Sequence, residues 1–123
     1  MREFKIRVWD VKNNDWYYTV PGRPDDHNVL DTWYFENLYQ DENTYIWEQY
    51  TGLRDKNGRE IYEGDIVRYK LYADSKLEYV DEVFYRIASG AFMVGDKDNL
   101  NTLDCLVDAE VIGNIHENKE LLK

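Results

Sequence analysis

Apolar and polar residues alternate along residues 4–9 and again along residues 16–20. A period of two places successive side chains on opposite faces of a sheet, so each run predicts a strand. Asn13, Asn14 and Asp15 separate the runs, and such residues tolerate turn geometry. We therefore predict a β-hairpin over residues 3–20.

The C-terminal half repeats short strand-like runs at intervals of about 8–12 residues, which favours a small sandwich or barrel. Turn residues separate the runs: Asp55-Lys56-Asn57-Gly58, Glu63-Gly64-Asp65 and Ser89-Gly90. Within the run 80–87, Val83, Tyr85 and Ile87 are expected to share one face. The predicted strands cover residues 45–53, 59–62, 66–72, 80–87, 91–94, 103–106 and 109–115, before a terminal helical turn at 118–122 capped by Asn118.

The segment between these halves gives a weaker pattern. Two prolines and a glycine make residues 21–28 an expected exposed loop. Residues 29–40 fit either a helical face or a short strand, and an irregular or short helical piece is favoured. At 123 residues the chain suits one domain, and any subdivision is expected near residue 50.

Charge is the compositional outlier, because 25 Asp and Glu face 15 Lys and Arg, a formal net charge of −10. Phosphate backbones repel such a surface, so direct nucleic-acid binding is not expected. The plain alternative is that the acidity only aids solubility.

Residues 24–53 contain no Lys or Arg but hold seven acids beside large aromatics. Such a stretch can form a recognition surface for a protein, and the candidate binding residues are Trp33, Tyr34 and Phe35 with Asp31 and Glu36. Two alternatives stay open: the aromatics form a core with the acids solvated, or the carboxylates imitate the phosphates of a duplex. Exposed aromatics and open sheet edges also favour a homo-oligomer.

No residue pattern indicates catalysis, a metal or a cofactor. Asp25-Asp26-His27 is interpreted as a solvated loop, since consecutive residues do not easily converge on one ion. Cys105 is expected to be a small buried hydrophobe and His116 a structural histidine. Phosphate-loop, dinucleotide-binding, nucleophile-elbow and zinc-protease motifs are absent from the sequence, so a non-enzyme is expected and a small-substrate enzyme is the remote alternative.

A single cysteine and the start Met1-Arg2-Glu3-Phe4, which has no apolar signal segment, predict a soluble protein of a reducing, intracellular compartment. No apolar run approaches membrane-spanning length.

The segment from Gln49 to Val67, QYTGLRDKNGREIYEGDIV, resembles the central signature of the YopX family of phage and prophage proteins. The start, from Arg2 to Asp10, resembles the family's opening strand, and the end, from Glu110 to Leu122, its closing strand and terminal turn. The resemblance is in the right order over nearly the whole chain.

The resemblance implies an all-β fold: a small SH3-like barrel in the C-terminal half, preceded by an N-terminal β-hairpin and an irregular aromatic segment. Residues 1–123 would form one YopX-like domain, with an aromatic, acidic subdomain at 1–49 and the barrel at 50–123. The family implies no activity, cofactor or site residue. The expectation is a non-enzymatic module of the bacterial host cytoplasm that binds a protein or itself, the alternatives being an acidic DNA mimic or other nucleic-acid-directed regulator.

Overall fold

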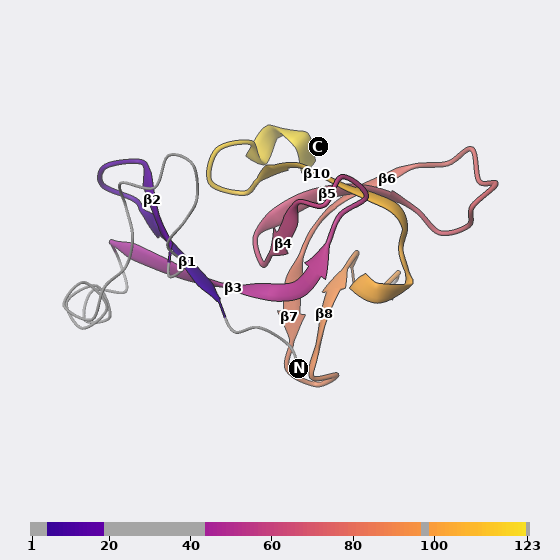
Figure 1. Cartoon of the computed structure of the whole chain (residues 1–123), viewed down its shortest axis with the longest axis horizontal. Coiled ribbons are helices and arrows are strands. Elements are labelled where there is room, and N and C mark those ends of the chain that lie inside the picture. Colours follow the sequence, from indigo (N-terminus) through magenta and orange to yellow (C-terminus); the bar gives the residue numbers. More distant parts are fainter. Residues whose placement is uncertain (1–4, 19–43, 97–98, 123) are drawn as a thin grey trace. The chain divides into compact units, whose positions relative to one another are not determined.

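The computed structural model describes residues 5–18, 44–96 and 99–122, in which antiparallel strands are the main regular secondary structure (Figure 1). The chain divides into two compact units, Met1–Tyr50 and Thr51–Lys123. The predicted all-β class is confirmed, while the SH3-like barrel stays a prediction. No helix in the described ranges is long and apolar enough to cross a membrane.

Unit 1 contains the predicted N-terminal hairpin. Strand β1 (Ile6–Asp10) pairs with β2 (Asp15–Tyr18) on one side and with the first part of β3 (Tyr45–Arg54) on the other. The Asp10 carboxylate closes the turn by accepting the backbone N–H groups of Lys12 and Asn13, each at 3.1 Å. Asn14 adopts a left-handed φ of 52°, which Asn tolerates better than most residues.

Val8 is the centre of the described core of unit 1. It is completely buried, and Tyr17, Tyr45 and Trp47 pack against it. Tyr50 is also buried. In the described part of the cation-free stretch, Tyr50 is therefore buried and Tyr45 and Trp47 are partly buried against Val8, as the first of the two alternatives expected.

A buried ion pair joins two strands of unit 1. Arg7 on β1 and Glu48 on β3 are direct cross-strand partners, with 2.9 Å between Arg7 Nε and Glu48 Oε1 and about 6% and 5% of their side chains exposed. The Arg7 guanidinium also lies over the Trp16 ring, 4.4 Å from its centroid. Glu48 was expected to be solvated or part of a recognition surface, and this was wrong. Its carboxylate lies directly opposite Arg7 on the neighbouring strand and is buried in an ion pair with it.

Several predictions concern residues 19–43, which lie outside the described residues. They are the loop at 21–28, the segment 29–40, the Asp25-Asp26-His27 cluster, and the candidate binding residues Asp31, Trp33, Tyr34, Phe35 and Glu36.

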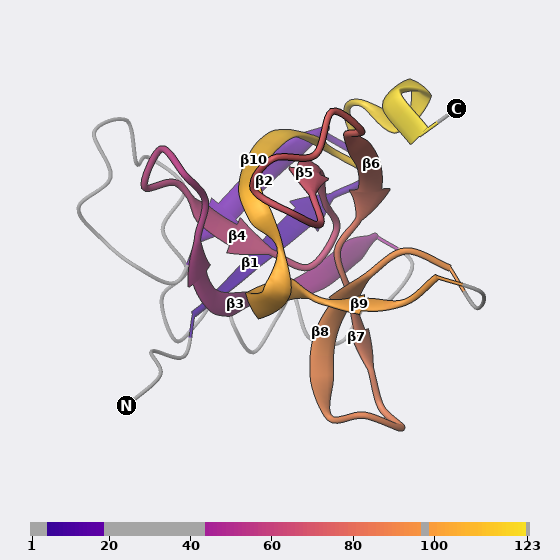
Figure 2. The ribbon, with the colours of Figure 1, turned by 90° about the vertical axis from the view of Figure 1, so that its right-hand side faces the viewer.

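Unit 2 holds two three-stranded sheets and the pairing of the end of β3 with β4. One sheet has the order β10-β5-β6 and the other β7-β8-β9; Figure 2 shows β7 and β8 projecting as a hairpin within this unit. Two short 3-10 helices, η1 and η2, complete the unit. The bounds are β4 Glu60–Tyr62, β5 Asp65–Lys70, β6 Tyr79–Glu82, β7 Phe84–Arg86, β8 Ala91–Val94, β9 Asn101–Thr102, η1 Leu103–Cys105, β10 Val107–Asn114 and η2 Lys119–Leu122.

Apolar side chains from both sheets meet in one core. Tyr69 is 1% exposed, and its hydroxyl donates a 2.6 Å hydrogen bond to the Asp81 carboxylate. Burial, and then the neighbouring Asp81 charge, raise the pKa of Tyr69, so it stays a neutral donor. The buried members of the core are Ile61, Val67, Tyr69, Val83, Phe92, Val94, Leu103 and Val111.

Three predictions about strands were wrong. Residues 80–87 form β6 and β7 in different sheets, because the pairing with β5 ends with the Val83 N–H bond to the Asp65 carbonyl and the chain pairs with β8 from Phe84 onward. Val83 is consequently buried while Tyr85 and Ile87, expected on the same face, are exposed. Residues 103–105 form η1 instead of a strand, and the strand predicted to reach residue 72 ends at Lys70.

The end of β10 turns sharply around Asn114. The Asn114 side-chain oxygen accepts the N–H groups of His116 and Glu117, and the side-chain oxygen of Asn118 accepts the Asn114 N–H. Gly113 leaves room for this packing, since a Cβ there would lie 2.7 Å from Asn118 Cβ. The side chain of Asn118 thus bonds to the end of β10, whereas a cap on the terminal turn was predicted.

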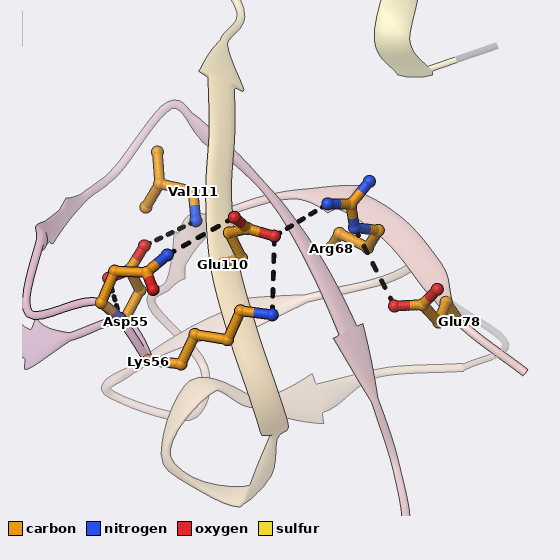
Figure 3. A network of polar contacts seen from close by, with 7 residues as sticks. Asp55, Lys56, Arg68, Glu78, Glu110 and Val111 are labelled. Carbon is orange, nitrogen blue, oxygen red and sulfur yellow. Dashed lines mark hydrogen bonds and ion pairs between the residues drawn. The ribbon is translucent and has the colours of Figure 1, made fainter. Parts of the chain in front are cut away.

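Asp55 connects segments that are distant in sequence. Its Oδ1 accepts the N–H groups of Asn57 and Arg59, each at 2.9 Å, and its Oδ2 accepts the N–H of Val111 on β10, also at 2.9 Å (Figure 3). The Lys56 N–H also connects this turn to β10, because it donates to the Ala109 carbonyl at 2.9 Å. Gly58 has a φ of 83°, the left-handed angle that glycine adopts without strain. The turn predicted at residues 55–58 is confirmed.

We expect replacement of Asp55 by Asn to lower the free energy of unfolding by about 2–3 kcal/mol, because an amide has one acceptor oxygen for three backbone donors. Burial alone would raise the pKa of Asp55, but the three backbone donors outweigh it and hold that pKa below its usual range. A lowered carboxyl pKa stabilises the fold above the ordinary Asp pKa, and this contribution is lost as pH falls through the folded-state value.

Urea unfolding between neutral pH and about pH 3 measures this contribution. The difference between wild type and Asp55→Asn should be largest near neutrality and shrink below about pH 4. The exposed Asp74→Asn serves as the control and should show neither effect. A difference that does not change with pH would contradict the role given to the ionised carboxylate.

We also expect Glu48→Ala to destabilise unit 1 by about 3–5 kcal/mol, since it leaves the Arg7 guanidinium buried without its carboxylate. The double variant Arg7→Met/Glu48→Leu should recover most of that loss, because an apolar pair carries no charges whose hydration is lost on burial. Urea denaturation followed by tryptophan fluorescence measures both effects.

The control for the ion pair is Glu78→Ala. It removes an exposed pair with Arg68, whose closest atoms are 3.9 Å apart, and should cost less than about 1 kcal/mol. Equal losses for Glu78→Ala and Glu48→Ala would show that burial does not determine the effect.

Candidate functional site

Unit 2 carries an open depression of about 290 Å³ between the turn after β3 and the segment from η1 to β10. Pockets for drug-sized ligands begin near this volume, so the depression suits one or two side chains better than a large cofactor. Its lining consists of Leu53, Arg54, Asp55, Lys56, Ile61, Leu103, Asp104, Leu106, Asp108 and Ala109.

The floor of the depression is apolar and belongs to the core. Ile61 and Leu103 are buried, Leu106 and Ala109 pack against the same core, and Leu53 is 37% exposed at the edge. The Asp55 carboxylate is occupied by its backbone donors. The floor is therefore held in place by secondary structure and by the Asp55 turn.

The cations of the rim already have partners. Arg54 donates to the Gly58 carbonyl at 3.0 Å and lies 3.5 Å from Glu60, while Lys56 Nζ lies 3.7 Å from Glu110. Glu110 is the centre of a surface network, because its Oε1 also accepts from Arg68 at 2.8 Å (Figure 3). The Arg68 hydrogen bond, assisted by Lys56, lowers the pKa of Glu110, and Glu110 in turn raises the pKa of Arg68.

The acidic residues of the rim differ from its cations in their ion pairing. Asp104 and Asp108 are exposed, and within the described ranges neither makes an ion pair. Asp104 accepts only a weak hydrogen bond from Cys105 Sγ, at 3.6 Å. Asp108 has a left-handed φ of 53° and lies where β10 bulges away from β5, between Val107 and Glu110. The uncompensated charge at the rim is therefore negative.

This arrangement can bind a cationic group but offers little for metal chemistry. In the part of the chain that the structure describes, no three His, Cys, Asp or Glu side chains gather closely enough to hold an ion. An apolar floor beneath two carboxylates suits a long Lys or Arg side chain, whose methylene stem prefers apolar surface and whose charged head prefers carboxylates and water.

The sequence did not indicate this site. Neither Asp104 nor Asp108 was singled out, because an acid in a short 3-10 turn and a left-handed acid among apolar residues leave no periodic pattern in the sequence. Cys105 itself was expected to be buried but is exposed, since η1 turns its side chain outward to Thr102 Oγ1 at 3.0 Å. His116 is half-buried, and its backbone N–H belongs to the Asn114 turn.

Comparisons with known proteins agree with the resemblance read from the sequence. The family model described as YopX protein matches residues 5–123. Among solved structures, the chain is similar to protein EF1440 from Enterococcus faecalis, with 30% sequence identity over 100% of both chains and a TM-score of 0.65. No curated protein matches the sequence. The chain therefore belongs to the YopX protein family.

Proposed function

We propose that the chain is a non-enzymatic protein-binding module whose unit 2 takes up a basic side chain of its partner. The observation that carries the proposal is the pair Asp104 and Asp108, two exposed acids that make no ion pair with the described residues and that border an apolar floor. The formal net charge of −10 supports the same class of partner, because it attracts basic proteins during encounter.

The rigidity of the site supports specific binding. Asp55 fixes the turn on one side of the depression to β10 on the other, so the distance between the two walls does not have to be set by the ligand. A preformed groove loses less conformational entropy on binding than a flexible one. The ligand class is therefore a Lys or Arg flanked by a small apolar residue, presented by an exposed protein segment.

The sequence supports a second contact in unit 1. Trp33, Tyr34 and Phe35, flanked by Asp31 and Glu36, combine aromatic anchors with negative charge and no cation nearby. Such a segment suits the same kind of basic partner. It is proposed on sequence grounds alone.

Mimicry of a nucleic-acid duplex is the second candidate, because the net charge of −10 is also what a phosphate mimic needs. The two candidates differ in how localised the binding is. A mimic distributes its contacts over many carboxylates, whereas the proposed module depends on two.

We expect Asp104→Asn/Asp108→Asn to weaken binding of a labelled peptide with alternating Leu and Lys by roughly five- to tenfold, since each exposed charge contributes about 0.2–1 kcal/mol. Fluorescence anisotropy at several salt concentrations measures the affinity, which should fall as salt rises. The matched control is Asp74→Asn/Asp96→Asn, two exposed acids outside the depression, with the same change in net charge.

The same titration separates the candidates. If both double variants lose the same amount of peptide affinity, the localised site is wrong and duplex mimicry is favoured. Competition between the chain and a labelled DNA duplex for a basic protein would then test mimicry directly. A loss confined to Trp33→Ala/Tyr34→Ala/Phe35→Ala would move the site to the N-terminal segment. A peptide in which Glu replaces Lys should not bind.

A further inference from the structure

The β7–β8 hairpin of unit 2 presents an apolar surface to solvent. Ile87 at its tip is 88% exposed and Tyr85 on β7 is 43% exposed, while Phe92 on β8 packs edge-on against Tyr85 with ring centroids 5.1 Å apart. Figure 2 shows the hairpin projecting within the unit. Large apolar side chains at such a position mark a contact surface.

The tip is held by its own hydrogen bonds. The Gly90 N–H donates to the carbonyls of Arg86 at 2.8 Å and Ile87 at 3.2 Å, and the Arg86 guanidinium donates to the Ser89 hydroxyl. Gly90 has the left-handed φ, 63°, that this turn needs. Ile87 is therefore displayed on an ordered turn, so burying it against another molecule costs little further ordering.

Charge indicates which molecule covers this surface. Residues 83–95 contain no Asp or Glu and one cation, Arg86, in a chain with a formal net charge of −10. Two copies of such a chain repel each other wherever acids meet, and this repulsion is screened beyond about 8 Å at physiological salt. The hairpin is thus a surface on which two copies can approach without bringing carboxylates together.

The other sheet edges are protected against such pairing. β7 is an edge strand without an acid, whereas β2, β4, β6 and β10 each carry at least one; β9 has two residues and ends two positions before Asp104. Acids on an edge hinder its pairing with a second copy of an acidic chain, whereas the charged residue of β7 is the cation Arg86. Among the described edges, β7 is the one left open to antiparallel addition of an identical strand.

We propose that two copies of the chain associate symmetrically through their β7–β8 hairpins, with the β7 edges antiparallel and Tyr85 and Ile87 buried between them. A two-fold contact places like residues near like residues, so the acid-free composition of the hairpin is what permits it. The contact lies outside the acid-rimmed depression, and its failure would leave the proposed binding of a basic partner untouched.

Sedimentation velocity of the full chain over a range of concentrations tests the proposal. We expect wild type to form a dimer or larger assembly that tightens between about 0.15 M and about 1 M salt, because salt screens the repulsion between acidic subunits. Binding of a basic peptide should weaken over the same range, which distinguishes the two interactions. A wild-type chain that stays monomeric throughout would overturn the proposal.

Both Ile87→Glu and Ile87→Lys should weaken association by at least about tenfold, since each places a charge in the apolar surface that the contact buries. The controls are Leu77→Glu and Leu77→Lys, at a position 67% exposed in the loop between β5 and β6, and these should associate as wild type does. Tighter association of Ile87→Lys would mean that the hairpin meets an acidic surface, and would refute the symmetric arrangement.

A measurement on the wild-type chain does not depend on these variants folding. Amide hydrogen exchange of residues 84–87 should slow as the protein concentration rises, because the outer edge of β7 gains partners. Slowing confined to other strands, with none at β7, would place the contact elsewhere. Ile87→Glu should still bind the Leu-Lys peptide with wild-type affinity.

Discussion

The tie between Asp55 and β10 determines much of what unit 2 presents at its surface. One carboxylate satisfies two N–H groups of its own turn and the N–H of Val111, which is 56 residues further along the chain. Three charge-assisted hydrogen bonds to one side chain fix the position of the turn against β10, and the depression lies between these two segments. Together with the bond from the Lys56 N–H to the Ala109 carbonyl, this tie defines the wall of the depression on the turn side, beside the apolar floor formed by Ile61 and Leu103.

The parts of the fold that sequence could predict are those determined by neighbouring residues. The hairpin of β1 and β2 and the turns at Asp55–Gly58 and Glu63–Asp65 follow from alternation and from residues that accept backbone N–H groups or adopt positive φ. The predictions that were wrong concern features that depend on contacts between residues distant in the sequence. Alternation continues through Val83, but the pairing with β5 ends there and the chain then pairs with β8, and this change of partner leaves no trace in the local pattern. The candidate site was missed for the same reason, since it depends on an exposed 3-10 turn and on a left-handed Asp108 in a bulge.

The acids of this chain do several different things, so the net charge of −10 has no single explanation. Asp55 and Glu48 are buried and are held by backbone donors and by Arg7, so they stabilise the fold. Glu110 is compensated by Arg68 and Lys56 on the surface. What composition alone could not show is which carboxylates are left after these pairings. In unit 2 they include Asp104 and Asp108, and this remainder is the charge that a partner would meet.

The uneven distribution of charge also decides which surfaces of unit 2 can be used together. Any contact between copies that included the depression would bring Asp104 and Asp108 of one copy toward those of another, at a cost that grows as water is excluded. A contact through the acid-free hairpin avoids that cost and leaves the depression open in each copy. The proposed self-association and the proposed binding of a basic partner would therefore use separate surfaces. Each copy added to an assembly would then add one more acid-rimmed site, so association through the hairpin raises the number of sites presented to a basic partner with several exposed cations.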